Sequence, residues 1–172
     1  MVARILGVSF LSLFLTFAAW GRSSENATCR ARGEAISFNN SQVLQWKSST
    51  PNAWQGRGHV QGLVVETLRE RDTHLHFLLK IGPNPRDVVE VVYNNSFGDL
   101  PELNPGSQVV VCGDYITAHS QNGKYPPSPA GAIIHWVHGS PNGRHEDGFV
   151  AVGGRVFGQR GQMNRGRSHM DF

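Results

Sequence analysis

From Gly58 onward the sequence alternates short apolar runs with clusters of glycine, proline, asparagine and aspartate, and this texture restricts the fold most. Short apolar runs bounded by turn-forming residues are typical of an all-β domain. A Gly153-Gly154 pair between two of the runs suits a two-residue hairpin turn, because both turn positions need positive φ angles. The predicted strands are 58–68, 74–81, 88–93, 108–117, 133–137, and the hairpin 149–152 with 155–157.

The order of these runs predicts a small five-stranded OB-like Greek-key barrel with a C-terminal hairpin and a short N-terminal helix. The long first strand carries a glycine at its middle, Gly62, and two shorter strands, a Leu-Pro-rich crossing and a strongly apolar fourth strand follow. A β-sandwich is the alternative. Alternation in the second strand places Leu75, Phe77, Leu79 and Ile81 in the core and leaves His74, His76 and Lys80 outside. In an OB barrel, that outer face commonly binds ligands.

The predicted domains are a signal peptide (1–21), a helical or extended segment (22–57), the barrel (58–158) and a disordered tail (159–172). Arg4, the apolar run from Ile5 to Phe17 and the small residues that follow indicate export to the bacterial periplasm or secretion. No later run is apolar for about 18 residues, so no membrane span is expected. Weak helical spacing links Ala27, Ala31, Ala35 and Phe38, and a more extended pattern starts at Ser41.

The two cysteines, Cys29 and Cys112, are expected to form a disulfide bond in an oxidising compartment. Two separate thiols, one buried and one in the N-terminal segment, are the alternative.

The charge distribution argues against strong nucleic-acid binding. Removing Arg4 and the three tail arginines from the 16 basic residues, and Asp171 from the 13 acidic ones, leaves twelve of each. A formally neutral folded region lacks the basic face that a phosphate-backbone binder needs. A Gly-rich phosphate loop that opens a helix is also absent from the sequence.

Three histidines, His135, His138 and His145, lie within eleven residues around the turn-forming sequence Gly-Ser-Pro-Asn-Gly. Histidine titrates near neutrality and is the commonest metal ligand, so this loop is the candidate site. His135 and His138 serve one site only if the strand ends between them, because positions three apart face opposite sides of a strand. In a structural alternative, His135 packs with Trp136 while the other two hydrogen bond to the loop backbone.

Three kinds of chemistry fit the loop. Arg144 is suited to bind an anion, or to form a salt bridge with a neighbouring carboxylate. A divalent metal such as zinc would need His138 and His145 together with His74 or Asp147, although the spacing lacks a rigid metal-binding motif. General acid/base catalysis would use His138 and His145, with Arg144 stabilising negative charge.

Two segments in this region resemble a known family: Gly131-Ala-Ile-Ile-His-Trp-Val-His, and Gly143-Arg-His-x-x-Gly148 followed by an aromatic residue. With Val111-Cys-Gly-Asp-Tyr-Ile116 and His74-x-x-Phe77, they make residues 43–157 similar to the bacterial exported family called domain of unknown function number thirty-four sixty-five. Phe149 departs from the tryptophan expected there. The resemblance implies a fold and an exported location, and it implies no activity.

The sequence therefore predicts an exported ligand-binding or accessory module for an anionic or oligomeric ligand. The predicted ligand-binding residues are His74, His76, Tyr93, His135, Trp136 and Arg144. The alternative is a hydrolase of the phosphodiesterase or nuclease type that uses His138, Arg144 and His145, with or without a metal. Neither catalysis nor the oligomeric state is predicted from the sequence.

Overall fold

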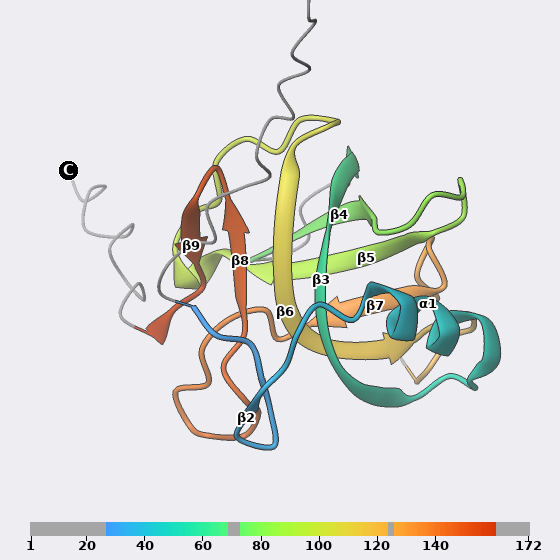
Figure 1. Cartoon of the computed structure of the whole chain (residues 1–172), viewed down its shortest axis with the longest axis horizontal. Helices are drawn as coiled ribbons and strands as arrows, with labels where there is room; N and C mark the ends of the chain where they lie inside the picture. Colours follow the sequence, from blue (N-terminus) through green and yellow to red (C-terminus); the bar gives the residue numbers. More distant parts are fainter. Residues whose placement is uncertain (1–26, 69–72, 124–125, 161–172) are drawn as a thin grey trace, which may run out of the picture.

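The computed structural model describes residues 27–68, 73–123 and 126–160 (Figure 1). The predicted signal peptide and nearly all of the predicted tail lie outside these residues. The fold is mostly β, built around a closed five-stranded barrel, which confirms the predicted class and excludes the β-sandwich. The barrel strands are β3 (Trp54–Thr67), β4 (His74–Lys80), β5 (Val88–Asn94), β6 (Gln108–Thr117) and β7 (Ala132–His135).

The strands pair in the order β3-β4-β5-β7-β6, and β6 returns to β3 to close the barrel. All neighbours are antiparallel except β5 and β7, which run parallel. The chain order around the barrel is therefore first, second, third, fifth, fourth, as expected for an OB-like Greek key.

The long strand β6 connects the barrel to the C-terminal hairpin. One edge pairs with β3, and the other pairs with β7 over its second half and with β8 (Phe149–Val152) over its first half. β9 (Arg155–Phe157) then pairs with β8, so the hairpin extends the sheet beyond the barrel (Figure 1). The predicted bounds of β6, β8 and β9 agree with the structure.

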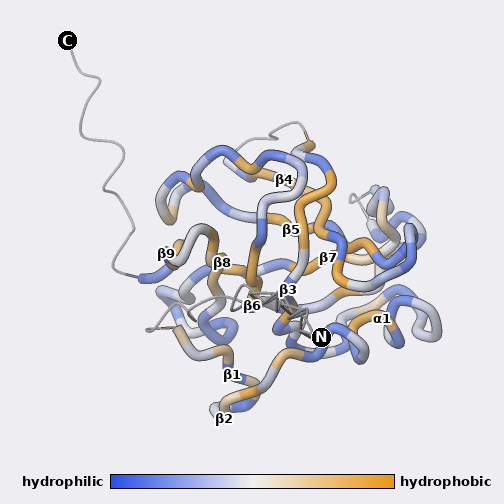
Figure 2. The backbone as a smooth tube through the Cα atoms, turned by 45° about the horizontal axis from the view of Figure 1, so that its top comes forward, coloured by the Kyte–Doolittle hydropathy of each residue, from blue (hydrophilic) through white to orange (hydrophobic). Residues whose placement is uncertain are grey.

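The core follows the predicted alternation. Phe77 and Leu79 in β4 are fully buried, and Ile81 is nearly so. In β6, Val109, Val111 and Tyr115 face the barrel interior with them, while Cys112 is buried in a smaller cluster with Cys29 and Phe149. Figure 2 shows this as apolar segments in β4, β5 and β6. Gly62 is needed where the backbone of β4 approaches β3 closely, because a Cβ atom there would lie 2.1 Å from the Lys80 carbonyl oxygen.

The N-terminal segment differs from the prediction. Helical spacing was expected from Ala27 to Phe38, but the chain forms a small hairpin of β1 (Arg30–Ala31) and β2 (Glu34–Ala35). Arg32 and Gly33 turn it with φ angles of 55° and 82°. Positive φ at two successive turn residues matches the twist of a tight hairpin, and this requirement outweighs the weak helical spacing.

The helix α1 (Asn40–Ser49) lies where a more extended chain was expected. Its Val43 is fully buried and its Trp46 stacks on Tyr115, so one face packs on the barrel. Thr50 is extended, as the residue before Pro51 must be, and the helix ends there.

The predicted disulfide bond between Cys29 and Cys112 is present, with a Cα–Cα distance of 5.5 Å. It attaches the N-terminal segment to β6, and both cysteines are buried. Among the described residues, no helix is both long and apolar enough to cross a bilayer.

Candidate functional site

The histidine loop closes over a pocket of about 470 Å³ at one end of the barrel. Four imidazoles border it, those of His74, His135, His138 and His145, together with the guanidinium of Arg144. The remaining lining residues are Asn94, Asp114, Trp136, Pro141 and Asn142. The structure thus brings together six residues that the sequence predicted for a site. We call this cavity the histidine pocket.

A left-handed residue places His135 and His138 at the same pocket. β7 ends at His135, earlier than predicted, and Trp136 follows with a φ angle of 49°. This turn breaks the strand alternation that would have sent the two histidines to opposite faces. Gly148 permits the close packing behind the turn, because a Cβ atom there would lie 2.2 Å from the Trp136 carbonyl oxygen. The condition that the sequence set for a shared site is therefore met.

His138 and His145 lie edge to face, with ring centroids 5.1 Å apart. The Nδ1 of His138 lies 2.8 Å from the Gly139 carbonyl, and that of His145 lies 2.9 Å from the Glu146 carbonyl. A carbonyl only accepts, so each Nδ1 carries a proton in these bonds. Within the described chain no hydrogen bond occupies either Nε2, and no buried side-chain nitrogen lacks a partner. Each neutral ring therefore keeps an unpaired Nε2 lone pair that solvent reaches.

The environment disfavours protonation of the deeper rings. Burial is the main cause that lowers the pKa of His135 to about 4, and the neighbouring imidazoles of His74 and His138 contribute to the same shift. Burial also lowers the pKa of His138, which stacks on Phe97 with ring centroids 4.0 Å apart. His135 and His138 are therefore neutral at pH 7, and the Arg144 guanidinium supplies positive charge at the same pocket.

Hydrogen bonds between residues close in sequence hold the loop in shape. The fully buried Ser140 accepts a bond from the His145 amide at its Oγ, and its own amide donates to Asp147 Oδ1 at 2.7 Å. The Asn142 side chain accepts from the Arg144 amide, and Gly143 turns the chain with a φ angle of 67°. The loop is thus a folded element, and Arg144 stands exposed at its tip.

The turn of the N-terminal hairpin hydrogen bonds to the histidine loop. Glu146 accepts bonds from the amides of Arg32 (2.8 Å) and Gly33 (2.7 Å). Burial alone would raise the pKa of Glu146, but these two amides and the charge of Arg57 lower it below its usual value. The carboxylate is therefore charged at pH 7 and joins the loop to a segment more than 100 residues away in sequence.

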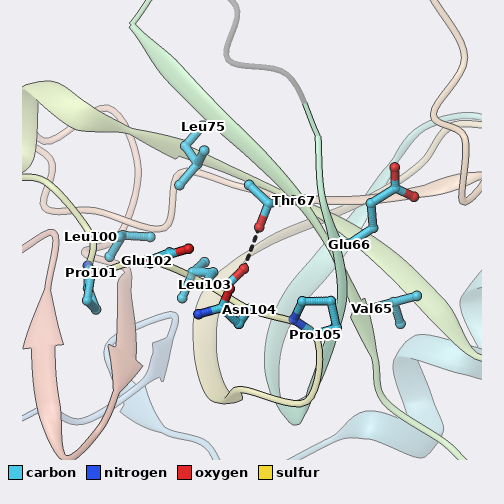
Figure 3. Close-up of a pocket in the computed structure, with 10 residues that line it drawn as sticks. All are labelled: Val65, Glu66, Thr67, Leu75, Leu100, Pro101, Glu102, Leu103, Asn104 and Pro105. Atoms are coloured by element: carbon cyan, nitrogen blue, oxygen red, sulfur yellow. Dashed lines mark hydrogen bonds between the residues drawn. The ribbon is translucent and has the colours of Figure 1, made fainter.

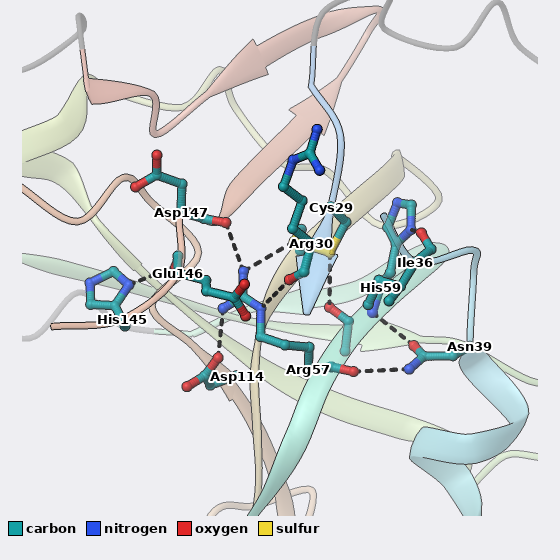
Figure 4. Close-up of a disulfide and its surroundings, with 12 residues drawn as sticks. Cys29, Arg30, Ile36, Asn39, Arg57, His59, Asp114, His145, Glu146 and Asp147 are labelled. Atoms are coloured by element: carbon teal, nitrogen blue, oxygen red, sulfur yellow. Dashed lines mark hydrogen bonds and ion pairs between the residues drawn. A yellow bond between two sulfur atoms is a disulfide. The ribbon is translucent and has the colours of Figure 1, made fainter. Parts of the chain in front are cut away.

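Arg57, which is only 6% exposed, links the same elements from the barrel side. Its guanidinium donates to Asp114 Oδ1 (2.6 Å), to the Arg30 carbonyl (3.1 Å) and to the Asp147 carbonyl (2.7 Å) (Figure 4). Asp114 lines the pocket and pairs in register with both Arg57 and His135. No local sequence pattern marks Arg57 as part of the site, because its partners come from three separate segments.

Three predicted site residues lie elsewhere. Tyr93 was expected on the outer face, but it is fully buried and its hydroxyl bonds to the Gly98 carbonyl at 2.6 Å. It pairs in register with Leu75, whose face packs on the core, so Tyr93 must share that face. His76 does not line the pocket and pairs with the buried Glu90 through Nδ1 at 2.7 Å.

Asp147, a candidate zinc ligand, is also outside the pocket. Its carboxylate bonds to the Ser140 amide and the Arg160 guanidinium, and these contacts hold its pKa low although burial acts to raise it. Across the described ranges, no three histidine, cysteine, aspartate or glutamate side chains are grouped so that they could hold a metal ion. The zinc ligands considered from the sequence, His138 and His145 with His74 or Asp147, are therefore not grouped as a metal site in the described chain.

A second pocket of about 530 Å³ lies between the end of β3, Leu75 of β4 and the crossing at residues 100–105 (Figure 3). Its ionisable lining residues are Glu66 and Glu102, and the Thr67 hydroxyl donates to the Leu103 carbonyl at its wall. Leucine, valine and proline side chains make up most of the rest. An anion would meet two carboxylates and no positive charge there, so the histidine pocket is the candidate site.

Scans against protein-family models, curated proteins and solved structures found no match to this chain.

Proposed function

We propose that the protein is an exported OB-like module that binds an anionic, phosphate-bearing ligand in the histidine pocket. The observation that carries this proposal is the grouping of four imidazoles and the Arg144 guanidinium around one cavity. A guanidinium binds phosphate oxygens in a bidentate manner, and imidazolium N–H groups add charge-assisted hydrogen bonds. The neutral remainder of the fold supports a small ligand over a long polyanion.

Because Nδ1 of His138 and of His145 donates to a backbone carbonyl, phosphate binding at these rings is expected to depend on proton uptake. A neutral His138 or His145 presents an Nε2 lone pair, which repels a phosphate oxygen. Only the protonated ring offers an Nε2–H donor. Phosphate binding must therefore take up protons, and affinity is expected to rise as the pH falls, by up to about tenfold per pH unit for each proton taken up.

The export proposal rests on the N-terminal sequence, and the buried disulfide bond supports an oxidising compartment, either a bacterial periplasm or the extracellular medium. The similarity to domain of unknown function number thirty-four sixty-five is part of the same proposal. It rests on the two histidine-containing motifs, whose residues border the pocket.

Isothermal titration calorimetry with inorganic phosphate at pH 5.5, 6.5 and 7.5 tests the binding. Affinity should increase toward pH 5.5, and Arg144→Ala should weaken binding roughly tenfold at each pH. Arg155→Ala, which removes an exposed arginine from β9, is the matched control and should bind like the wild type. Equal weakening in both variants, or no binding at pH 5.5, would rule out the pocket as an anion site.

A second candidate function is phosphodiester hydrolysis, and the His138–His145 pair favours it. One ring with a free Nε2 lone pair can take a proton from water, while a protonated ring donates to the leaving oxygen and Arg144 stabilises the charge. Burial lowers the pKa of His138, so we assign it the role of base. Hydrolysis of bis(p-nitrophenyl) phosphate should then show a bell-shaped pH profile whose alkaline limb disappears in His145→Gln. No turnover above buffer would leave the binding function alone.

A further inference from the structure

We propose that Trp54 forms a stacking subsite for a nucleobase beside the histidine pocket, so that the ligand is a mononucleotide or a short oligonucleotide. This inference rests on the proposed anion-binding function and names its substrate class.

Trp54 is an exposed aromatic residue held in one orientation. It is 55% exposed, the most exposed of the large apolar side chains in the described chain. Its indole Nε1–H donates to Asp114 Oδ2 at 3.1 Å, and the other oxygen of Asp114 accepts from the buried Arg57. The ion pair anchors the carboxylate, and the carboxylate anchors the indole. Trp54 thus offers its π face to solvent with its polar atom already satisfied.

The register places Trp54 on the same outer face as the pocket. Trp54 pairs with Ile116 of β6, two residues after Asp114, so both β6 residues point to that face. Asp114 lines the pocket and pairs with His135, and Ile116 pairs with Ile133 of β7. Trp54 is not itself a lining residue, but it lies on β3, on the other side of Asp114 from His135, and its indole contacts this pocket residue.

The two features together fit a nucleotide. Nucleobases stack on exposed aromatic side chains with little preference among bases, because every base has a π face. Such a base is joined through one sugar to a phosphate, for which the histidine pocket and Arg144 provide the charge. The formal neutrality of the folded region limits contacts to further phosphates, which favours a short ligand.

Calorimetric titration at pH 5.5 with adenosine 5′-monophosphate, ribose 5-phosphate and inorganic phosphate tests the subsite. The wild type should bind adenosine 5′-monophosphate roughly 5- to 150-fold more tightly than ribose 5-phosphate, the range expected from one stacked base. Trp54→Ala should abolish this ratio while inorganic phosphate binds as before, and Trp54→Phe should retain part of it. Phe38→Ala is the matched control, since Phe38 is also exposed but packs on His59.

An unchanged ratio in Trp54→Ala would overturn the subsite, as would equal losses for all three ligands, because Trp54 would then act only through Asp114. Failure of inorganic phosphate to bind the wild type would instead overturn the anion pocket. In that case, a base preference that still depends on Trp54 would leave the stacking subsite standing. The absence of both would overturn both.

Discussion

Glu146 accepts a hydrogen bond of 2.7 Å from the backbone amide of Gly33, although 113 residues separate them in sequence. The contact joins the loop that carries His138 and His145 to the turn of the N-terminal hairpin. The pocket geometry therefore depends on a segment that contributes no residue to the pocket lining.

Replacing Glu146 with Gln should release the hairpin turn from the loop. Amide hydrogen exchange at Arg32 and Gly33 should lose protection, because one amide oxygen cannot replace two carboxylate oxygens as acceptors. The loss of unfolding free energy should be about 1 kcal/mol or less, since the side chain is largely solvated. Glu34→Gln, a change of the same kind on the exposed β2 strand, is the control. Unaltered protection at both amides in Glu146→Gln would contradict this role.

Removing the disulfide bond should lower the free energy of unfolding far more than Glu146→Gln does. Cys29 and Cys112 are 83 residues apart, and a loop of that length corresponds to about 4 to 5 kcal/mol in the chain-entropy model. Alanine is the suitable replacement for both residues, because the buried sites would not accommodate a serine hydroxyl without a partner. Urea unfolding of the double variant gives the measurement, and the wild type under reducing conditions should behave in the same way. An unchanged urea midpoint in the double variant would show that the disulfide bond does not stabilise the barrel.

Stability should fall as the pH drops from 6.5 toward 4. The pKa of His135 is about 4 in the folded protein and 6.5 in the unfolded chain. The unfolded chain therefore binds more protons than the folded protein between these pH values, and stability falls as the pH drops. His138 acts in the same direction, because burial lowers its pKa as well. The shift of His135 corresponds to a loss of roughly 3 kcal/mol as an upper bound.

Urea unfolding in a buffer without phosphate, at several pH values between 7 and 4.5, measures this dependence. His135→Asn should flatten the curve. The lowered pKa values of Glu146 and Asp147 add to the loss only near the acid end of this window, because the unfolded carboxyls, with pKa values of 4.5 and 3.8, begin to bind protons there. A wild-type curve that is already flat would contradict the desolvated, neutral state of His135.

Replacement of the two loop histidines by alanine should lower the unfolding free energy by different amounts. His138→Ala should lower the unfolding free energy by roughly 1 to 3 kcal/mol, because the ring is buried, stacks on Phe97 and bonds to the Gly139 carbonyl. His145→Ala should change it by less than about 1 kcal/mol, since that ring is only half-buried. His138→Phe should restore much of the stacking while phosphate binding stays weak. Equal losses for His138→Ala and His145→Ala would indicate a purely structural cluster.

Much of the barrel was predictable because its signals are local. The alternation in β4 and the apolar run of β6 identify the core face directly, and the glycine pair fixes the β8–β9 turn. The disulfide bond was predictable because the sequence has two cysteines and its N-terminal pattern predicts export. The position of Tyr93 was also within reach, since its register opposite Leu75 assigns it to the core.

The rest depended on contacts distant in sequence. Nothing local marks Arg57 as buried, because its partners lie on β1, β6 and the histidine loop. Nothing local predicts that Trp136 adopts a left-handed conformation, which is rare for a bulky residue. The six site residues were recognised by type, but the way they meet depends on that one turn and on the N-terminal hairpin.

The C-terminal hairpin has a consequence for self-association. Within the described residues the sheet ends at β9, which is only three residues long, carries the exposed Arg155 and is followed by Gly158 with a φ angle of 87°. A short, charged edge offers few backbone groups to a strand from another copy. The apolar β6, which would template such pairing, has both edges covered by β3, β7 and β8. The hairpin thereby covers the edge of β6 from Val109 to Cys112, and its loss would expose this valine-rich edge to pairing with another copy.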